Sequence, residues 1–477
     1  MPPATAASPS RSLAIGAAAA PVEQPALARI AGPILAELLL GVAVGVAGLW
    51  LASQISDATS GAFALANQVQ ATFFILFRVI GMGVSVVTTQ NLGAGNRTAA
   101  DDTARASLGI STWLGGGVGL AVLIAAPWLL TLLNAPAEVQ PIAAPYLRLL
   151  ALGLALDAYN STMNAVLRAH LRVRDALVNV LAMHALHLLL CLPLMRGFGP
   201  VPALGLPGFA LALAASRVFG LVLHLALWRR RFGLVPTRRD WWRIDWPRLA
   251  PVLHIGIPGA AENIAYRTAL MCTVAIVAGM GAKALATQAY VMQVMLLILM
   301  VGLSVGFASE ILVGRLVGAR RLHDAHRLVR RSLALGLCTS TGFALLAALS
   351  SGWFLRFYTH DPEIIATAQR LLWITVLLEP GRTFNIVVIN ALRAAGDARY
   401  PVMAGTASLI VVMAGGSWLL GHWAGLGLIG VWIAYAADEW VRGLTMAARW
   451  WRHGWVPSAR GTHRALMRRR RPAPALA

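Results

Sequence analysis

Residues 33–37 read Pro-Ile-Leu-Ala-Glu, and residues 258–262, which lie 225 positions later, read Pro-Gly-Ala-Ala-Glu. Both stretches lie inside long apolar segments, where a carboxylate is costly unless it is protonated, paired or hydrated. The same offset relates other residues over most of the chain: Gln68 and Gln293, Arg105 and Arg330, Ser107 and Ser332, Asn160 and Asn385, residues 167–169 and 392–394 (both Leu-Arg-Ala), and Arg217 and Arg442. One offset that holds without drift indicates a duplicated structural unit.

The composition is that of a membrane protein. Hydrophobic residues make up 58% of the chain and charged residues 12%, against roughly 25% charged residues in soluble domains. Apolar stretches long enough to cross a hydrocarbon layer of about 30 Å as helices recur along the chain. They lie at about 28–53, 62–90, 107–133, 143–167, 177–195, 205–228, 251–279, 284–313, 333–356, 364–392, 401–421 and 425–448. The sequence therefore predicts an all-α, polytopic membrane protein with twelve transmembrane helices.

Each half of the chain contains six of these stretches, so the second half begins on the same side of the membrane as the first. The two six-helix repeats are therefore predicted to be parallel, with a central cleft between two lobes. The expected organisation is a disordered cytoplasmic tail (1–27), an N-terminal lobe (28–228), a cytoplasmic linker (229–250), a C-terminal lobe (251–450) and a basic cytoplasmic tail (451–477).

The net charge of +21 raises the question of nucleic-acid binding, and the placement of the charge argues against it. With twelve spans, 30 basic residues fall in loops and tails on one side, whereas only Arg196, Lys283 and Arg356 fall in loops on the other. This asymmetry predicts that both termini are cytoplasmic. A nucleic-acid-binding protein would instead gather its charge on one folded face. The preference for arginine over lysine is typical of a GC-rich bacterium, which indicates the bacterial inner membrane.

The arginines at 468–471 have two interpretations, a contact with anionic membrane lipids and a solvated tail that sets the topology. The three cysteines lie inside apolar spans at no metal-like spacing, so neither a metal site nor a disulfide is expected.

Acidic residues inside the predicted spans are the candidates for binding a coupling cation. Glu37 and Glu262 each follow a proline by one helical turn, and Glu379 lies in the tenth span. A carboxyl group in a partly dry cavity can hold a proton or exchange it for another cation. Pro33 and Pro258 each remove a backbone hydrogen bond and are predicted to break or bend their helices. The structural alternative is that the two glutamates cap this broken ladder or pair with arginines.

Other charges within the spans favour local ion pairs at helical spacing. The expected structural pairs are Glu379 with Arg382, and Asp438 and Glu439 with Arg442. Arg78 and Arg267 have no partner nearby in the sequence and are expected to neutralise acids on neighbouring helices. Glu310 lies near the end of the eighth span, where we expect its side chain to reach the membrane surface.

Four stretches resemble the multidrug and toxic compound extrusion (MATE) transporters. Residues 256–262 (Gly-Ile-Pro-Gly-Ala-Ala-Glu) resemble the family's seventh-span signature. Residues 90–95 (Gln-Asn-Leu-Gly-Ala-Gly) and 313–319 (Val-Gly-Arg-Leu-Val-Gly-Ala) resemble the segments that follow its second and eighth spans. Residues 379–397 resemble the end of its tenth span and the following loop. Together the matches cover essentially residues 28–450.

The resemblance implies a V-shaped, two-lobe transporter rather than an enzyme. Such transporters export amphipathic, often cationic compounds by alternating access, in exchange for inward-moving H+ or Na+. We therefore expect small amphipathic, cationic drugs as substrates, no cofactor beyond the coupling ion, and a monomer. The sequence departs from the family at Ala43, where an aspartate is common, and at Tyr266, near which the seventh-span glutamate often sits.

Substrate is expected in the cleft near the membrane midplane. The candidate contacts are Gln68, Gln293, Asn160, Asn385, Tyr290 and Met292. One alternative is a flippase for lipid-linked saccharides, which would need several arginines deep in the first lobe; only Arg78 and Arg217 qualify, which argues against it. Another is an intramembrane enzyme, which would need a nucleophile–base pair or a metal triad within the membrane.

Overall fold

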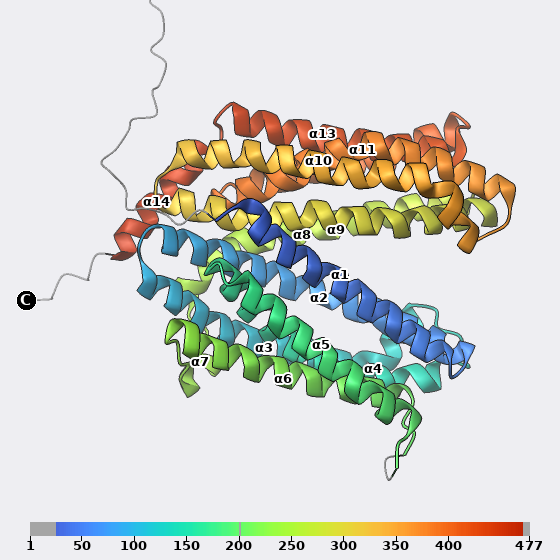
Figure 1. Cartoon of the computed structure of the whole chain (residues 1–477), viewed down its shortest axis with the longest axis horizontal. Coiled ribbons are helices and arrows are strands. Elements are labelled where there is room, and N and C mark those ends of the chain that lie inside the picture. The colour runs from blue at the N-terminus through green and yellow to red at the C-terminus, as the bar shows by residue number, and fades with distance from the viewer. Residues whose placement is uncertain (1–24, 200–201, 471–477) are drawn as a thin grey trace, which may run out of the picture.

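The computed structural model describes residues 25–199 and 202–470, which are almost entirely helical (Figure 1). The first lobe contains α1 (Leu27–Ser53), α2 (Asp57–Gly93), α3 (Arg97–Leu132), α4 (Gln140–Ala169), α5 (Val173–Arg196) and α6 (Leu206–Phe232). The second contains α8 (Trp246–Ala278), α9 (Ala282–Gly318), α10 (Leu322–Phe354), α11 (Pro362–Ala394), α12 (Arg399–Ser408) with its π-helical continuation η2 (Leu409–Gly415) and η3 (Ser417–Trp423), and α13 (Gly427–Trp451). A short 3-10 turn, η1 (Leu355–Phe357), extends α10.

These helices confirm the prediction of an all-α, twelve-helix architecture in two lobes. Within the described residues, 10 helices are long and apolar enough to cross a membrane. The other two long helices, α8 and α13, carry charged side chains near their middles. The lobes come together at the end of the molecule near the C terminus and diverge toward the opposite end (Figure 1).

The duplication extends to the turns that end equivalent helices. Gly95 ends α2 with φ 71°, and its equivalent Arg320 ends α9 with φ 61°. Leu171 and Gly396 likewise follow α4 and α11 with φ 61° and 87°. A left-handed residue after a helix reverses the chain and commonly satisfies its last carbonyl groups. Equivalent positions in the two repeats share this left-handed conformation, even where the residue is not glycine.

The lobes exchange apolar side chains where they meet. Ile30 of α1 is 2% exposed and packs in a core built mainly from α9, α10 and α11 of the second lobe. Its equivalent, Ile255 of α8, is 4% exposed and packs in a core built mainly from α2, α3 and α4 of the first. The start of the first long helix of each lobe therefore packs in the core of the other lobe.

Equivalent backbone contacts close one end of the molecule. The helices α2, α4, α6, α9 and α11 all end there, and the segments that follow them carry many of the arginines, so we call it the arginine-rich end. A Cβ atom on Gly93 would lie 2.0 Å from the carbonyl oxygen of Arg315, and one on Gly318 would lie 2.0 Å from that of Gln90. Only glycine permits so close an approach of two helices. This end is therefore tightly closed between α2 and α9.

The segments outside the lobes differ from the predicted boundaries. The linker is shorter than 229–250, because α6 continues to Phe232 and α8 begins at Trp246. Between them α7 (Arg238–Trp242) lies on α3, where the Trp113 indole donates to the Trp242 carbonyl at 2.9 Å. The expected tail 1–27 lies largely outside the described residues.

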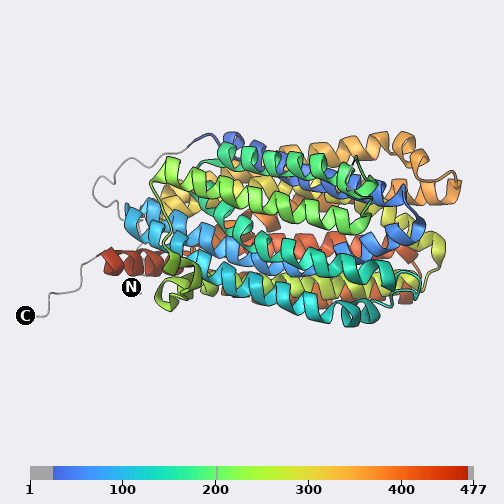
Figure 2. The ribbon, with the colours of Figure 1, turned by 90° about the horizontal axis from the view of Figure 1, so that it is seen from below.

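The basic tail expected at 451–477 contains a further helix, α14 (Val456–Arg470), which projects from the arginine-rich end (Figure 2). A ring nitrogen of His463 lies 2.9 Å from the Gly318 carbonyl oxygen. The Trp450 and Trp455 rings stack at 4.1 Å between centroids and hold the start of α14 against α13.

The predicted helix breaks at Pro33 and Pro258 are not observed. Both prolines lie within continuous helices, α1 and α8. Pro33 is the seventh residue of α1, and the helix continues through it although the Arg29 carbonyl loses its usual donor. Pro258 lies further inside α8, next to Gly259, and the helix continues through it.

Candidate functional site

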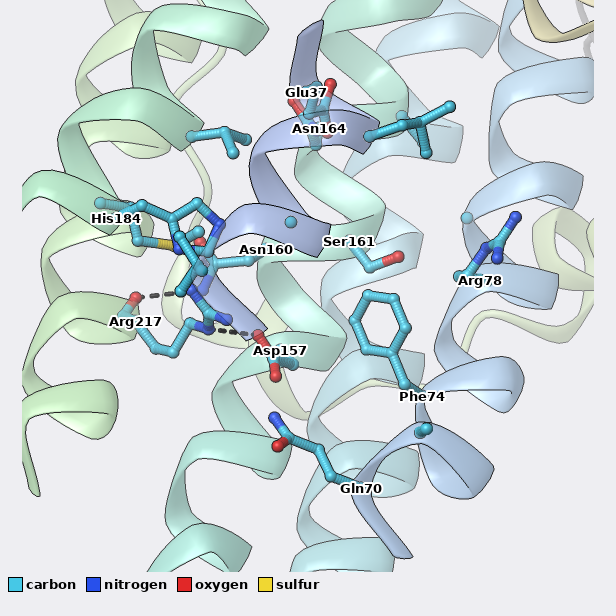
Figure 3. A pocket seen from close by; sticks show the side chains of 18 of the residues that line it. Glu37, Gln70, Phe74, Arg78, Asp157, Asn160, Ser161, Asn164, His184 and Arg217 are labelled. Carbon is cyan, nitrogen blue, oxygen red and sulfur yellow. Dashed lines mark hydrogen bonds and ion pairs between the residues drawn. The ribbon is translucent and has the colours of Figure 1, made fainter. Parts of the chain in front are cut away.

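A cavity of about 550 Å³ lies in the first lobe and is bordered by α9 of the second. Side chains of α1, α2, α4, α5 and α6 form the rest of its wall. Arg78 and Phe74 of α2 lie on one side, and Asp157 of α4 and Arg217 of α6 lie on the other (Figure 3). The cavity therefore has charged and amide side chains set in a mainly apolar wall.

Two carboxylates in the cavity are paired with arginines. Glu37 of α1 forms an ion pair with Arg168 near the end of α4 and accepts a hydrogen bond from Asn164 Nδ2 at 2.6 Å. Asp157 Oδ1 lies 2.6 Å from Arg217 Nε. Removing one partner would leave a poorly solvated charge uncompensated, so these pairs tie α1 to α4 and α4 to α6.

Amide and imidazole groups continue the polar wall. Asn160 Nδ2 donates to the Arg217 carbonyl oxygen at 3.0 Å, and Asn160 Oδ1 lies 3.2 Å from His224 Nδ1. His184 and His187 are buried and line the same cavity. Asn160 thus lines this cavity, and its amide is held by α6.

The second lobe repeats the first of these ion pairs. Glu262 Oε2 lies 2.5 Å from Arg393 Nη2, and Glu262 and Arg393 are the equivalents of Glu37 and Arg168. The structure therefore brings each predicted glutamate against the arginine of the repeated Leu-Arg-Ala stretch. Pairing with an arginine, the structural alternative, is observed for both.

A larger charge cluster lies between α11 and α13. Arg382 Nη1 lies 2.6 Å from Glu379 Oε1, and Arg382 Nε lies 3.2 Å from Glu439 Oε1. Arg442 Nη2 lies 2.6 Å from Asp438 Oδ2 and 3.1 Å from Glu439 Oε1. The predicted local pairs exist, and the contact from Arg382 to Glu439 joins them into one network across two helices.

This network holds three carboxylates and two guanidinium groups, so its fully ionised form carries an excess negative charge. All five side chains are buried, and Glu379 is only 1% exposed. Asn385 Nδ2 donates to Glu439 Oε2 at 3.0 Å, and Ser408 Oγ donates to Asp438 Oδ1 at 2.7 Å. An excess charge at this depth is costly and can be relieved by taking up a cation. Asn385 belongs to this cluster, and it does not line the cavity of the first lobe.

Glu310 contradicts the expectation that its side chain reaches the membrane surface. It is 3% exposed and borders the cavity together with Ser85, its equivalent in the first repeat. The reason is that α9 continues two turns beyond Glu310 and that α2 covers this part of it. Glu310 lies within electrostatic reach of Arg168 in one lobe and Arg393 in the other.

The expectation that Arg78 and Arg267 neutralise acids on neighbouring helices is also wrong. Within residues 25–199 and 202–470, neither side chain has a carboxylate within salt-bridge distance. The guanidinium of Arg78 instead lies 5.8 Å from the centroid of the Phe307 ring. Arg78 lines the cavity and Arg267 does not.

The remaining predicted cleft residues lie outside the cavity. Gln68 is exposed on α2, whereas its neighbours Asn67 and Gln70 line the cavity. Gln293 is likewise exposed on α9. Tyr290 and Met292 pack against the apolar core of the second lobe. A helical face is set by packing, and the offset alone could not identify which face of α2 or α9 borders the space.

Sequence reasoning missed several cavity residues and one set of pairings. Asp157, Asn164, His224 and Glu310 line the cavity without having been proposed for it. The signal for the pairing of Glu37 with Arg168 was present, because both residues belong to offset-matched stretches. No comparable signal marks Asp157, whose equivalent in the second repeat is Arg382.

The fold and the polar cavity define a two-lobe helical membrane transporter. The MatE family model matches residues 33–192 and 258–419, one match in each repeat. The chain belongs to this family, the multidrug and toxic compound extrusion transporters. It is therefore a transporter and not an intramembrane enzyme.

Individual proteins agree with this assignment. An uncharacterised transporter, YisQ of Bacillus subtilis, is 32% identical over 427 residues, covering 89% of this chain and 93% of its own. A probable multidrug resistance protein, NorM of Deinococcus radiodurans, is 29% identical and covers 89% and 94%. The solved outward-facing structure of a multidrug resistance MATE family transporter shares the fold, with a TM-score of 0.82 at 19% identity over 91% of this chain and 96% of that one.

Proposed function

We propose that this protein exports small amphipathic drugs across the bacterial inner membrane by alternating access, driven by inward-moving protons. The observation that carries the proposal is the combination of a cavity with polar side chains in the first lobe, in a molecule whose lobes are closed at one end, with a buried, negatively unbalanced charge cluster in the second lobe. The name of the NorM relative, a probable multidrug resistance protein, supports drugs as the substrate class.

The arginine-rich end faces the cytoplasm in this proposal, because basic loops are retained on that side. Both termini are then cytoplasmic. The lobes meet at this end and diverge at the other, so the described state corresponds to an outward-facing transporter (Figure 1). Transport requires the reciprocal state, in which α2 and α9 separate at the arginine-rich end.

The second-lobe cluster is the coupling site in this proposal. A proton that binds Glu379 neutralises the excess charge and weakens its pair with Arg382, 2.6 Å away. Arg382 also binds Glu439 of α13, so the change reaches the packing of α11 against α13. A proton is favoured over sodium because a proton needs a single carboxylate oxygen, whereas a metal cation needs several oxygen ligands, and guanidinium groups already occupy oxygens of all three carboxylates.

Glu37 and Glu262 take a different role in the proposal. Each carboxylate is held by one arginine of its own lobe, so neither carries an excess charge. They are placed to hold α1 against α4 and α8 against α11 while the lobes move. The flippase alternative needs unneutralised arginines in the first lobe, and Glu37 and Asp157 neutralise two of the three that line the cavity.

Purified protein in lipid vesicles tests the proposal when a proton gradient and a sodium gradient are imposed separately. A fluorescent amphipathic dye should be exported under the proton gradient and should stay in place under the sodium gradient. Export under the sodium gradient alone would mean that sodium, and not a proton, is the coupling ion. No response to either gradient would exclude antiport.

A further inference from the structure

Among the residues that the structure describes, the cavity contains one accessible positive charge without a carboxylate partner. Six charged side chains line it, and four of them form the pairs Glu37–Arg168 and Asp157–Arg217. Glu310 is almost fully buried, at 3% exposed. Arg78 remains, and its side chain is exposed to the cavity.

The surroundings of Arg78 leave its charge uncompensated. Its described protein contact is with the face of the Phe307 ring, 5.8 Å from the centroid. Arg168 and Arg267 lie within electrostatic reach and repel it. A guanidinium group that is exposed to a cavity and has no carboxylate partner is available to bind an anionic group of a ligand.

The side chains near Arg78 describe the rest of that ligand. Phe74 lies one turn away on the same face of α2, and Phe307 faces Arg78 from α9. Ser161 of α4 lies against α2, where its Oγ donates to the Phe77 carbonyl oxygen at 3.3 Å, and it adds a hydroxyl group to the lining (Figure 3). Two aromatic faces beside a guanidinium fork suit a planar aromatic ring that carries a carboxylate or a similar planar anion.

We propose that Arg78 binds an anionic group of the substrate, so that the transporter takes aromatic compounds bearing a carboxylate in addition to, or in preference to, purely cationic ones. This inference rests on the proposed function, because it names the chemistry of that transporter's substrate. It differs from the cationic substrates that the sequence led us to expect. The other two arginines that line the cavity, Arg168 and Arg217, are paired with carboxylates, so Arg78 is the guanidinium group that an anionic group of the substrate can reach.

A matched pair of dyes tests the assignment: a rhodamine with a free carboxylate and its methyl ester, whose ring systems are identical. Binding to purified protein is followed by fluorescence polarisation. Arg78→Gln should weaken binding of the carboxylate dye by roughly 10- to 100-fold, the loss expected for a charge-assisted hydrogen bond. Binding of the ester should change by less than about threefold. Arg78→Lys, which keeps the charge, should recover part of the affinity.

Arg267→Gln is the matched control, because it removes a nearby positive charge that does not line the cavity. It should leave the preference for the carboxylate dye unchanged. If Arg78→Gln weakened the binding of both dyes equally, Arg78 would have a structural role. If it weakened the binding of neither dye, Arg78 would not contact the substrate. Both results overturn the assignment.

Wild-type protein decides the question if Arg78→Gln does not yield folded protein. An aromatic carboxylate should then displace the carboxylate dye at least about ten times better than the corresponding amide does, and equal competition overturns the assignment. The proposed function is judged separately by export of the ester dye. Gradient-driven ester export without a carboxylate preference rejects this inference alone, whereas export of neither dye by wild-type vesicles rejects antiport.

Discussion

Gln90 and Arg315 occupy equivalent positions in the two repeats, and each donates a hydrogen bond across the boundary between the lobes. Gln90 Nε2 donates to the Ala394 carbonyl oxygen at 2.8 Å, and Arg315 Nη2 donates to that of Ala169 at 2.9 Å. Ala169 and Ala394 are themselves equivalent. The arginine-rich end is thus closed by a pair of contacts related by the symmetry of the duplication, although the donor residues differ.

Removing both donors should destabilise this closure. Each hydrogen bond contributes about 0.5–3 kcal/mol, so the Gln90→Ala, Arg315→Ala double variant should shift the population toward the state open at the arginine-rich end. Thr89 is fully buried on α2 against Gly314 of α9 and reports this opening. In a chain whose native cysteines are replaced, Thr89→Cys should react with a membrane-impermeant thiol reagent faster in the double variant. The same rate as in the parent would show that these bonds do not hold the lobes together.

The glycines beneath these contacts should tolerate no side chain. Gly318→Val would place a Cβ atom 2.0 Å from the Gln90 carbonyl oxygen, which requires α2 and α9 to move apart. We expect dye export to be lost while the protein remains folded. Gly116→Val on α3 is the control, because a Cβ atom there would meet nothing within 4 Å in the described part of the chain. Normal export by Gly318→Val would refute tight closure as a step of the cycle.

The sequence predicted the architecture well because the relevant signals are local or periodic. Apolar length identified the helices, and the fixed offset identified the two repeats. The pairing of Glu37 with Arg168 was not predicted, since it depends on α1 lying against the end of α4. Glu310 was misplaced because its burial depends on α2 covering α9. The equivalent contacts of Gln90 and Arg315 were not predicted, because the two positions share a role in the structure although their residue types differ.

The two equivalent ion pairs should behave alike in stability measurements. Breaking either pair leaves a partly buried charge, so Glu262→Gln and Arg393→Gln should each lower the free energy of unfolding. Because the side chains remain about a tenth exposed, at 12% and 9%, we expect a coupling energy of about 1–3 kcal/mol in a double-mutant cycle. Thermal unfolding in detergent provides the measurement, and Glu37 with Arg168 should give a similar value. Strict additivity of the single substitutions would indicate that the pairs contribute nothing beyond their separate side chains.

The second-lobe cluster should be sensitive to the loss of its bridging contact. Asn385→Ala removes a hydrogen bond of 3.0 Å to Glu439, the carboxylate that both arginines share. The expected result is a destabilisation of about 1–3 kcal/mol together with weaker coupling of dye export to the proton gradient. Asn263→Ala, whose amide donates only to the Gly259 carbonyl oxygen in its own helix, is the control. Equal effects of the two substitutions would remove Asn385 from the coupling site.

In the proposed mechanism Glu379 carries the coupling proton. The direct test is dye export by vesicles under an imposed proton gradient, comparing Glu379→Gln with Glu363→Gln, an exposed carboxylate on the same helix. Glu379→Gln should insert and fold normally and lose at least about tenfold in gradient-driven export, as expected when a buried proton-binding carboxylate is lost. Glu363→Gln should export at the wild-type rate. Export by Glu379→Gln at the wild-type rate would contradict the account.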